Sequence, residues 1–309
     1  MPMKIPFCIS LARSTSFQAV FSLVLGVLAL DFGPLPSSAD QRPEAQVTFE
    51  PSGASVNCYD YLEVTLNVAS PTVANPFTDV LVEGAFGLAG EKPLPVDGFC
   101  DSADGHLFRI RFMPAKPGQY QYVVKYRAGG FEAVHNGTFT AEDTQRKGLV
   151  RVDPEFPIHF RWEGTKERFF WNGTTAYWLA GWDDEDIDQI IERFDRLKVT
   201  RVRVALSGRI KDGRTLSEPV YSTDQFSFLL NPWVAKDPAS VEAPGFDVTR
   251  FNTPYWQKFE RLLGKARERD MIVSVIFYVE GGRPGVDPFG KAGIGGPDEQ
   301  RYYRYAVAR

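Results

Sequence analysis

Histidine is scarce in this sequence, and its positive and negative charges nearly cancel. The three histidines, His106, His135 and His159, have a spacing that matches no zinc-binding pattern. Lysine and arginine number 35 against 39 aspartates and glutamates, and the formal net charge of −4 argues against a surface that binds nucleic acid. No glycine-rich segment carries the lysine and the serine or threonine of a phosphate-binding loop. We therefore expect no metal, no cofactor and no nucleic-acid partner.

Apolar runs long enough to cross a bilayer comfortably are also lacking. The N-terminal apolar run, residues 17–30, is preceded by Lys4 and Arg13 and followed by the small residues Ser37-Ser38-Ala39. This order of a basic segment, a short apolar segment and a small-residue site is typical of a signal peptide. We interpret residues 1–39 as that peptide, and an uncleaved membrane anchor is the alternative. A signal peptide predicts a secreted or periplasmic protein without membrane attachment after cleavage.

Cysteine is rare as well, with three in the whole chain. Cys8 would be removed with the signal peptide, which leaves Cys58 and Cys100. An even pair in an exported chain is compatible with one disulfide. Two buried free thiols are the alternative, because the sequence does not give the distance between the two residues. Aromatic residues, in contrast, are plentiful, with 24 Phe, 12 Tyr and 6 Trp. They suit sugar-stacking surfaces and large hydrophobic cores alike.

Residues 46–152 show the pattern of many short strands. Leu62, Val64, Leu66 and Val68 alternate with polar residues, as in a half-buried strand, and similar runs recur up to residue 141. Turn residues separate these runs at short intervals. Asn136-Gly137 is the strongest hairpin signal among them, since this dipeptide favours a type I′ turn. Many short strands without a helical pattern predict an immunoglobulin-like β-sandwich over residues 40–150, with a linker near 144–157.

Residues 169–206 show a different pattern, in which a strand, a helix and a second strand follow one another. An aromatic, β-prone run over residues 169–179 comes first, and a β-branched run over residues 199–206 comes last. Between them, apolar residues such as Ile187, Ile191 and Phe194 have helical spacing. Strands joined by a helix at this length are parallel, and parallel sheets carry functional residues at the carboxyl ends of their strands. We therefore expect a functional site at this edge.

The same pattern recurs once more before the end of the chain. Thr253-Pro254 predicts the start of a helix, and Met271–Val279 is a nearly continuous apolar run, as in a strand buried on both faces. A third helix is expected from Asp298. The third strand would then leave an unpaired apolar edge, which folded proteins avoid. We expect residues 158–309 to be the truncated front of a larger domain, and a complete small α/β domain is the alternative.

Several motifs in the first segment resemble those of a known family. They are Asn75-Pro76-Phe77-Thr78-Asp79-Val80, Gly98-Phe99-Cys100, Arg109-Ile110-Arg111-Phe112-Met113-Pro114 and Pro117-Gly118-Gln119-Tyr120. Together they resemble the N-terminal immunoglobulin-like domain that precedes many proteins classed as glycoside hydrolases. Cys100 replaces the usual aromatic residue, and Tyr120 stands where tryptophan is common. Residues 169–206 are similar to the start of the apiosidase-like (β/α)8 hydrolases that follow this domain. The resemblance implies a β-sandwich followed by a truncated (β/α)8 TIM barrel with about three βα units.

The resemblance also implies a function, that of a fragment of a secreted glycoside hydrolase. Such an enzyme hydrolyses O-glycosidic bonds in a polysaccharide or oligosaccharide substrate, and it normally uses two carboxyl groups. In the family these groups follow the fourth strand and lie near the seventh, which places both beyond Arg309. We therefore assign no catalytic residue and expect the fragment to be inactive alone. The alternative is a non-catalytic secreted β-sandwich module that binds carbohydrate or protein, with the α/β part as a scaffold.

The remaining candidates are substrate-binding residues near the carboxyl ends of the parallel strands. Arg203 resembles a second-strand arginine that steadies the nucleophile of related barrels, and an ordinary salt bridge is the alternative. Glu280 would bind a sugar hydroxyl or else be a solvated loop residue. Asp183–Asp186 stand at a helix start, where they are better explained as capping groups than as catalytic ones. The other candidates are aromatic residues that would stack on a sugar or fill the core: Tyr177, Trp178, Trp233 and Tyr278.

Overall fold

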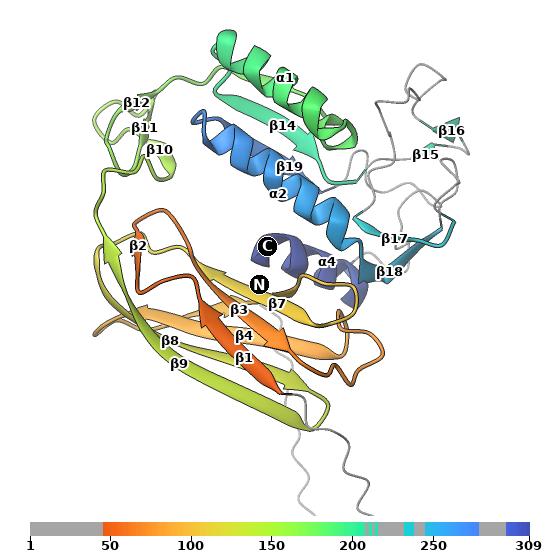
Figure 1. The fold of residues 1–309 in the computed structure, drawn as a ribbon. Coiled ribbons are helices and arrows are strands. Elements are labelled where there is room, and N and C mark those ends of the chain that lie inside the picture. Colours follow the sequence, from red (N-terminus) through yellow and green to blue (C-terminus); the bar gives the residue numbers. More distant parts are fainter. Residues whose placement is uncertain (1–45, 208–209, 212–213, 216–231, 238–244, 278–294) are drawn as a thin grey trace, which may run out of the picture. The chain divides into compact units, whose positions relative to one another are not determined.

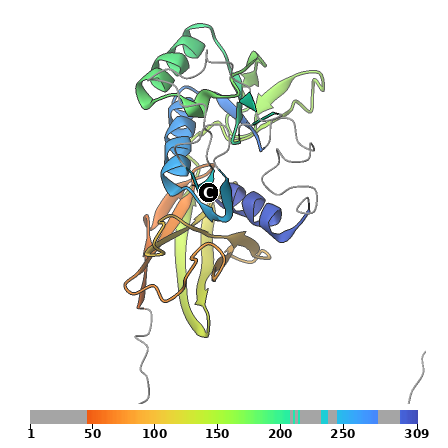
Figure 2. The ribbon, with the colours of Figure 1, turned by 90° about the vertical axis from the view of Figure 1, so that its right-hand side faces the viewer.

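The computed structural model describes residues 46–207, 210–211, 214–215, 232–237, 245–277 and 295–309, and Figures 1 and 2 show them in two views. The predicted signal peptide, residues 1–39, lies outside the described residues. The described residues belong to one compact unit. The domain boundary expected between residues 150 and 158 stays a prediction.

Two sheets account for the first part of the chain. The four-stranded sheet has the order β1-β3-β7-β6 (Val47–Pro51, Leu62–Val68, Leu107–Phe112, Phe99–Cys100), with antiparallel pairs throughout. The five-stranded sheet has the order β2-β9-β8-β4-β5 (Ser55–Asn57, Phe131–Glu142, Gly118–Ala128, Val80–Leu88, Leu94–Asp97), and only β2 and β9 pair in parallel. Aromatic contacts join the two sheets. Phe86 stacks on Phe112 with 4.9 Å between ring centroids, and Phe108 meets Tyr126 edge-on at 5.4 Å.

Strand β3 confirms the alternation that the sequence predicts. Leu62, Val64 and Leu66 are fully buried, whereas Glu63 and Thr65 between them are only half-buried. Successive side chains of a strand point to opposite faces, so the apolar set enters the core and the polar set faces outward. Burial of these side chains fixes the register of β3, because a slip by one residue would expose all of them.

The predicted hairpin turn at Asn136-Gly137 is wrong. Both residues lie within β9, where Gly137 pairs with Tyr122 of β8. The turn is at Gly129-Gly130, and Gly129 has the positive φ of 59° that a tight turn accepts most easily from glycine. A Cβ at position 137 would lie 2.3 Å from the phenol oxygen of Tyr122. Gly137 therefore makes room for a neighbouring ring, which is a role that its sequence context does not reveal.

The parallel sheet has the order β13-β14-β19 (Gly173–Thr175, Arg201–Ala205, Ile272–Ile276). The 3-10 helix η1 (Leu179–Gly181) and helix α1 (Asp184–Arg196) connect β13 to β14, and helix α2 (Thr253–Arg267) precedes β19. Helix α4 (Pro297–Ala308) follows. The predicted order of strand, helix and strand is thus confirmed. The first strand is shorter than expected, because the run over residues 169–179 divides among β12, β13 and η1.

Three smaller sheets complete the described residues. The first is antiparallel, with the order β10-β11-β12 (Val150–Val152, Phe160–Trp162, Arg168–Phe169), and it leads into the parallel sheet. The others are two-stranded, β15-β16 (Ile210–Lys211, Arg214–Thr215) and β17-β18 (Trp233–Ala235, Phe246–Phe251). Both lie in the long connection after β14.

The fold class predicted from the sequence is wrong. The described residues form six small sheets and three α-helices, and none of these sheets closes into a barrel. The result is a mixed, β-rich fold, which supports neither a TIM barrel nor an immunoglobulin-like sandwich in front of it. The sequence pattern shows that strands are parallel, but barrel closure depends on strand number and stagger, which are not local properties. None of the described helices has the length and the apolar character needed to span a membrane.

Candidate functional site

The candidate site lies on the face of the parallel sheet opposite helix α2. Val204 and Val275 are register partners on β14 and β19, and Val275 lines a small cavity of about 220 Å³ together with Phe259 and Leu263 of α2. This shared cavity identifies the face that the helix covers. The intervening residues Arg203 and Ser274 therefore point to the other face. Arg203 is only half-buried, whereas Val204 is fully buried.

A polar row crosses this second face. Thr175 of β13, Arg203 of β14 and Ser274 of β19 are direct register partners, so one hydroxyl, one guanidinium and a second hydroxyl lie side by side. Neighbouring strands are about 4.8 Å apart, and a single small ligand can therefore reach all three groups. Thr175 is exposed, and Ser274 is half-buried. We call these three residues the polar row.

Arg201 precedes Arg203 of the polar row by two residues on β14. Its Nε donates to Ser274 Oγ at 2.7 Å, and its guanidinium lies 4.9 Å from the centroid of the Trp171 ring. Both interactions hold the Arg201 side chain in place, because the ring face attracts a cation and the hydroxyl accepts a hydrogen bond. Arg203 has the same charge and lies two residues further along the strand, nearer to its carboxyl end.

Tyr177 and Trp178 stand at the carboxyl end of β13, as the sequence predicts. Their ring centroids are 6.0 Å apart, and both side chains are half-buried against the core. The backbone N–H of Ala205 donates to the carbonyl of Tyr177 at 2.9 Å, which fixes this segment beside the end of β14. Half-buried rings retain an accessible edge, so the arrangement is compatible with both a sugar contact and a core layer.

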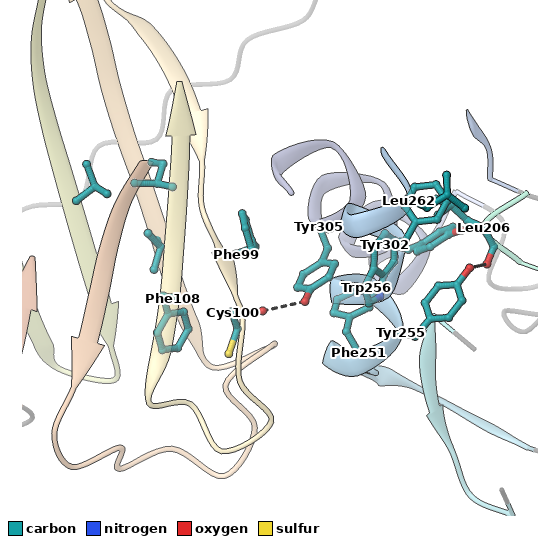
Figure 3. Close-up of a cluster of buried hydrophobic side chains, with 14 of the residues drawn as sticks. Phe99, Cys100, Phe108, Leu206, Phe251, Tyr255, Trp256, Leu262, Tyr302 and Tyr305 are labelled. Carbon is teal, nitrogen blue, oxygen red and sulfur yellow. Dashed lines mark hydrogen bonds between the residues drawn. The ribbon is translucent and has the colours of Figure 1, made fainter. Parts of the chain in front are cut away.

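The carboxyl end of β14 is closed by a buried hydrogen bond. Tyr255 Oη of α2 donates to the carbonyl of Leu206 at 2.7 Å (Figure 3). Burial raises the pKa of Tyr255 above its ordinary value, so the phenol stays protonated and keeps donating. This bond ties the end of β14 to the first turn of α2, and it makes the sheet edge a rigid support for the polar row.

One other candidate is not brought to the polar row by the described structure, and two more lie outside the described residues. Trp233 is fully buried on β17, where its ring lies 4.7 Å from Tyr302 and 5.7 Å from Phe246, measured between centroids. With no exposed ring face, Trp233 contributes to the core. Tyr278 and Glu280 lie outside the described residues.

The acidic run at the start of α1 has structural roles. Asp183 is the N-cap, and its Oδ1 accepts from the backbone N–H of Asp186 at 2.8 Å. Asp184 pairs with Arg261 of α2 at 2.9 Å. Burial lowers the pKa of Lys258, which donates to the carbonyl of Trp182, and the charges of Asp184 and Asp183 act in the opposite direction. These carboxylates therefore cap α1 and attach it to α2.

The polar row differs in chemistry from a hydrolytic centre. Strands β13, β14 and β19 carry no aspartate or glutamate, so no pair of carboxyl groups faces the row from these strands. Within the part of the chain that the structure describes, no three His, Cys, Asp or Glu side chains are arranged to hold a metal ion. The row can donate and accept hydrogen bonds and can neutralise an anion. Those properties suit binding rather than proton transfer.

Cys58 and Cys100 are both free and buried. This agrees with the alternative of two free thiols rather than with a disulfide. The Cys100 thiol donates to the carbonyl of Ser102 at 3.0 Å, and burial raises the pKa of Cys100 to about 12. A thiol with such a pKa stays protonated at neutral pH and is a poor nucleophile.

Thr175, Ser274 and Arg201 were missed by the sequence reasoning. Their importance comes from register, which pairs residues as far apart as Arg201 and Ser274, separated by 73 positions. The spacing of Arg201 and Arg203 does show that both lie on one face of a strand. Nothing in the sequence, however, reports which residues of the other strands stand beside them.

Comparison with known proteins gives one family match. The family described as "Domain of unknown function (DUF5060)" matches residues 55–127, from the start of β2 to nearly the end of β8. No curated protein matches the chain.

Among solved structures, the chain is similar to a protein described as a "putative glycoside hydrolase" from Bacteroides vulgatus. The identity is 24%, the TM-score is 0.58, and the match covers 73% of this chain and 41% of that one. The chain thus spans about two-fifths of the length of this relative. An engineered protein (14% identity, covering 32% and 20%) and a family 76 glycoside hydrolase from Bacteroides thetaiotaomicron (8%, covering 32% and 21%) each reach a TM-score of only 0.25. The family match and the Bacteroides vulgatus structure give no support to the narrower resemblance to an immunoglobulin-like domain or to an apiosidase-like barrel. The likeness shows that the chain shares its fold with the Bacteroides vulgatus protein.

Proposed function

We propose that the chain is the substrate-binding part of a glycoside hydrolase that acts on polysaccharide, and that its described residues do not supply the two catalytic carboxyl groups. The observation that carries this proposal is the polar row, with Arg203 at its centre. The fold shared with a protein described as a putative glycoside hydrolase supports the reaction class. Hydrolysis of an O-glycosidic bond needs an acid and a second carboxylate, and the strands that carry the row provide neither.

The chemistry of the row suits a hydroxylated ligand. The Arg203 guanidinium offers several N–H donors in one plane, and the hydroxyls of Thr175 and Ser274 both donate and accept. Sugar hydroxyls, and the carboxylate of a uronic acid, are complementary to such a set. Tyr177 and Trp178 lie just beyond the row at the carboxyl end of β13, where an aromatic edge can contact the apolar face of a sugar ring.

A polysaccharide substrate fits a location outside the cytoplasm. The predicted signal peptide at residues 1–39 is the basis for this part of the proposal, which places the mature protein in the periplasm or the medium. N-terminal sequencing of the protein recovered from these fractions tests it. A mature chain that begins after Ala39 supports export, and retention of residues 17–30 contradicts cleavage.

Affinity gel electrophoresis against a panel of neutral and acidic polysaccharides tests the role of the row. We expect at least one polysaccharide to retard the chain, and Arg203→Ala to weaken that binding by about tenfold or more, since hydrogen bonds to charged groups contribute about 1.5–3 kcal/mol. Arg196→Ala is the matched control. Arg196 is an exposed arginine of α1 that pairs with Glu192 at 3.9 Å, and its removal is expected to leave binding unchanged.

Two outcomes would contradict the proposal. Binding that survives Arg203→Ala would favour the alternative, a non-catalytic module that binds through its first two sheets. Failure of every polysaccharide to retard the chain would remove the basis for a substrate site. We also expect no release of reducing sugar from a bound polysaccharide, because the polar row lacks a carboxylate pair.

A further inference from the structure

Three sequence motifs in the region that matches the domain of unknown function contact β18, α2 and α4. These motifs are Asn75-Pro76-Phe77, Gly98-Phe99-Cys100 and Arg109-Ile110-Arg111. Each makes hydrogen bonds, ring contacts or ion pairs with residues more than a hundred positions away. The three sets of contacts are independent of the polar row.

The first motif, Asn75-Pro76-Phe77, forms hydrogen bonds with strand β18. Asn75 Nδ2 donates to the carbonyl of Thr249 at 3.1 Å and to its hydroxyl at 3.2 Å, and Arg250 donates to the carbonyl of Ala74 at 2.8 Å. Asn75 Oδ1 also accepts from the backbone N–H of Phe77 at 3.1 Å. This local turn points the Phe77 ring at Phe251, with centroids 5.6 Å apart in an edge-on arrangement. The loop is therefore shaped by its own hydrogen bonds to fit β18.

The second motif, Gly98-Phe99-Cys100, contacts helix α4. Tyr305 Oη donates to the carbonyl of Cys100 at 2.8 Å, and the Tyr305 ring lies edge-on to Phe99 at 6.0 Å (Figure 3). On its other side Tyr305 stacks on Phe251 at 3.8 Å. Burial raises the pKa of Tyr305, which keeps the phenol protonated as a donor. Tyr305 thus links α4, β18 and the strand β6 in one buried contact.

The third motif closes a ring of ion pairs. Arg109 pairs with Asp101 at 2.7 Å and with Glu63, and Glu63 pairs with Arg111 at 2.7 Å. Arg111 then pairs with Glu260 of α2 at 3.1 Å, and Glu260 pairs with Arg309 at 2.5 Å. Arg309 also pairs with Asp101 at 2.5 Å, which closes the circuit. Three carboxylates and three guanidinium groups therefore alternate around a closed circuit. Three of the six belong to the four-stranded sheet, Asp101 directly follows β6, Glu260 lies on α2, and Arg309 directly follows α4. We call this the ion ring.

Helix α4 needs such support. It has 12 residues, and isolated helices of this length are only marginally stable in water. Its buried residues include Tyr302, which contacts α2 through Trp256, and Tyr305, which contacts Phe99. The side of α4 that carries Tyr305 is buried against the first two sheets. Removing those sheets would expose Tyr305, Phe251 and two partners of the ion ring together.

We infer that the region matching the domain of unknown function is an intramolecular docking platform. Its partner is the surface formed by β18, α2 and α4, and its role is to keep that surface folded. The motifs that mark the region in the sequence are then contact residues of this platform.

Hydrogen exchange of the full chain, measured by mass spectrometry, tests this inference with Arg111→Met. Methionine keeps an apolar stem but leaves Glu63 and Glu260 without their shared partner. We expect amide protection in α2, β18 and α4 to fall by about tenfold or more, because breaking a buried ion pair is strongly destabilising. Protection in β8 and β9 should stay as in the wild type. Arg127→Met is the matched control, since Arg127 also pairs with two carboxylates, Glu83 and Glu132, but both belong to its own sheet.

A milder variant, Tyr305→Phe, covers the case in which Arg111→Met fails to fold. It removes the hydrogen bond that Tyr305 Oη donates to the Cys100 carbonyl and the one that it accepts from Arg309 at 2.9 Å. We expect faster exchange in α4 with unchanged β8 and β9. The inference is overturned if α4 exchanges at the wild-type rate in Tyr305→Phe. It is also overturned if Arg111→Met accelerates exchange only in β3 and β7, or equally in every segment, or if Arg127→Met loosens α2 and α4 to the same extent.

Discussion

Asp101 is a buried carboxylate held between two guanidinium groups. Burial by itself would raise the pKa of Asp101, but the charge of Arg309 and hydrogen bonds from Arg109, Arg309 and Gln257 outweigh it, so the pKa lies below its ordinary value. A carboxylate whose pKa is lower in the folded than in the unfolded state stabilises the fold at pH values above its unfolded pKa, about 3.9. That contribution is lost as the pH falls through the folded pKa.

The free energy of unfolding should therefore drop below about pH 4, and Asp101→Asn should flatten this drop. At pH 7 the same variant should be less stable by about 3 kcal/mol, because it leaves buried guanidinium groups without their carboxylate. Urea unfolding at a series of pH values between 3 and 7 measures both effects. Asp143→Asn, at an exposed position, is expected to reproduce the wild-type profile. An Asp101→Asn profile parallel to that of the wild type would refute the assignment.

Trp233 illustrates how an aromatic candidate can belong to the core. Because its side chain is fully buried, Trp233→Ala should lower the free energy of unfolding by about 3–5 kcal/mol, as large cavities in a core do. Trp233→Phe should fold and bind polysaccharide as the wild type does. Chemical denaturation and affinity electrophoresis separate the two properties. Phe170→Ala, at a side chain that is 79% exposed, is the control with little expected effect. Loss of binding in a stably folded Trp233→Phe would show that the ring contacts the ligand.

At the scale of elements, helix α1 depends on its N-cap. Asp183 Oδ1 accepts the N–H of Asp186, which has no partner within the helix, and replacing such a cap by alanine costs about 1 kcal/mol. We therefore expect Asp183→Ala to lower the free energy of unfolding by about 1 kcal/mol without affecting polysaccharide binding. Denaturant unfolding provides the measurement. Glu192→Ala, on the exposed surface of α1, should change it by less than about 0.5 kcal/mol. A loss of binding in Asp183→Ala would reopen a functional role for the acidic run.

Local patterns predicted several elements correctly. The alternation of β3, the helical spacing of α1, the start of α2 at Thr253 and the parallel pairing of β14 with β19 all follow from residues close together in the sequence. Arg203 was also placed on the correct strand, the middle strand of the parallel sheet. These features depend on the periods of helices and strands, which the order of apolar residues reveals directly.

Features that depend on distant neighbours were not predicted. Gly137 leaves room for the Tyr122 ring of the neighbouring strand, so the hairpin propensity of Asn136-Gly137 was misleading. The predicted barrel failed for a similar reason, because closure is decided by pairing between strands far apart in the chain. At the candidate site, Thr175 and Ser274 join Arg203 only through register. The ion ring likewise unites charges from five separate segments, and no local charge pattern marks them as partners.

For the whole molecule, the position of tryptophan offers a direct test of coupling. All six tryptophans follow residue 150, at positions 162, 171, 178, 182, 233 and 256, so their fluorescence reports only on that part of the chain. Far-UV circular dichroism reports on every strand and helix. Because the ion ring and the Tyr305 contacts join the two parts, the wild type should unfold in urea with coincident curves for both signals.

Arg111→Met should separate the two curves, with the fluorescence transition moving to lower urea than the circular dichroism transition. The reason is that weakened contacts let the tryptophan-containing part unfold first. Arg127→Met should leave the curves coincident. Separate transitions in the wild type itself would contradict the coupling of the two parts.

The environment of Arg111 has a consequence for which residues can replace it. Its guanidinium lies 5.1 Å from the centroid of Tyr61 and 5.0 Å from that of Phe99. A flat group fits between two such rings while its edge still reaches Glu63 and Glu260, whereas the tetrahedral ammonium of lysine offers neither the plane nor the fork of donors. Replacing Arg111 by lysine therefore preserves the net charge of the protein but removes the planar group on which the contacts with Tyr61 and Phe99 depend.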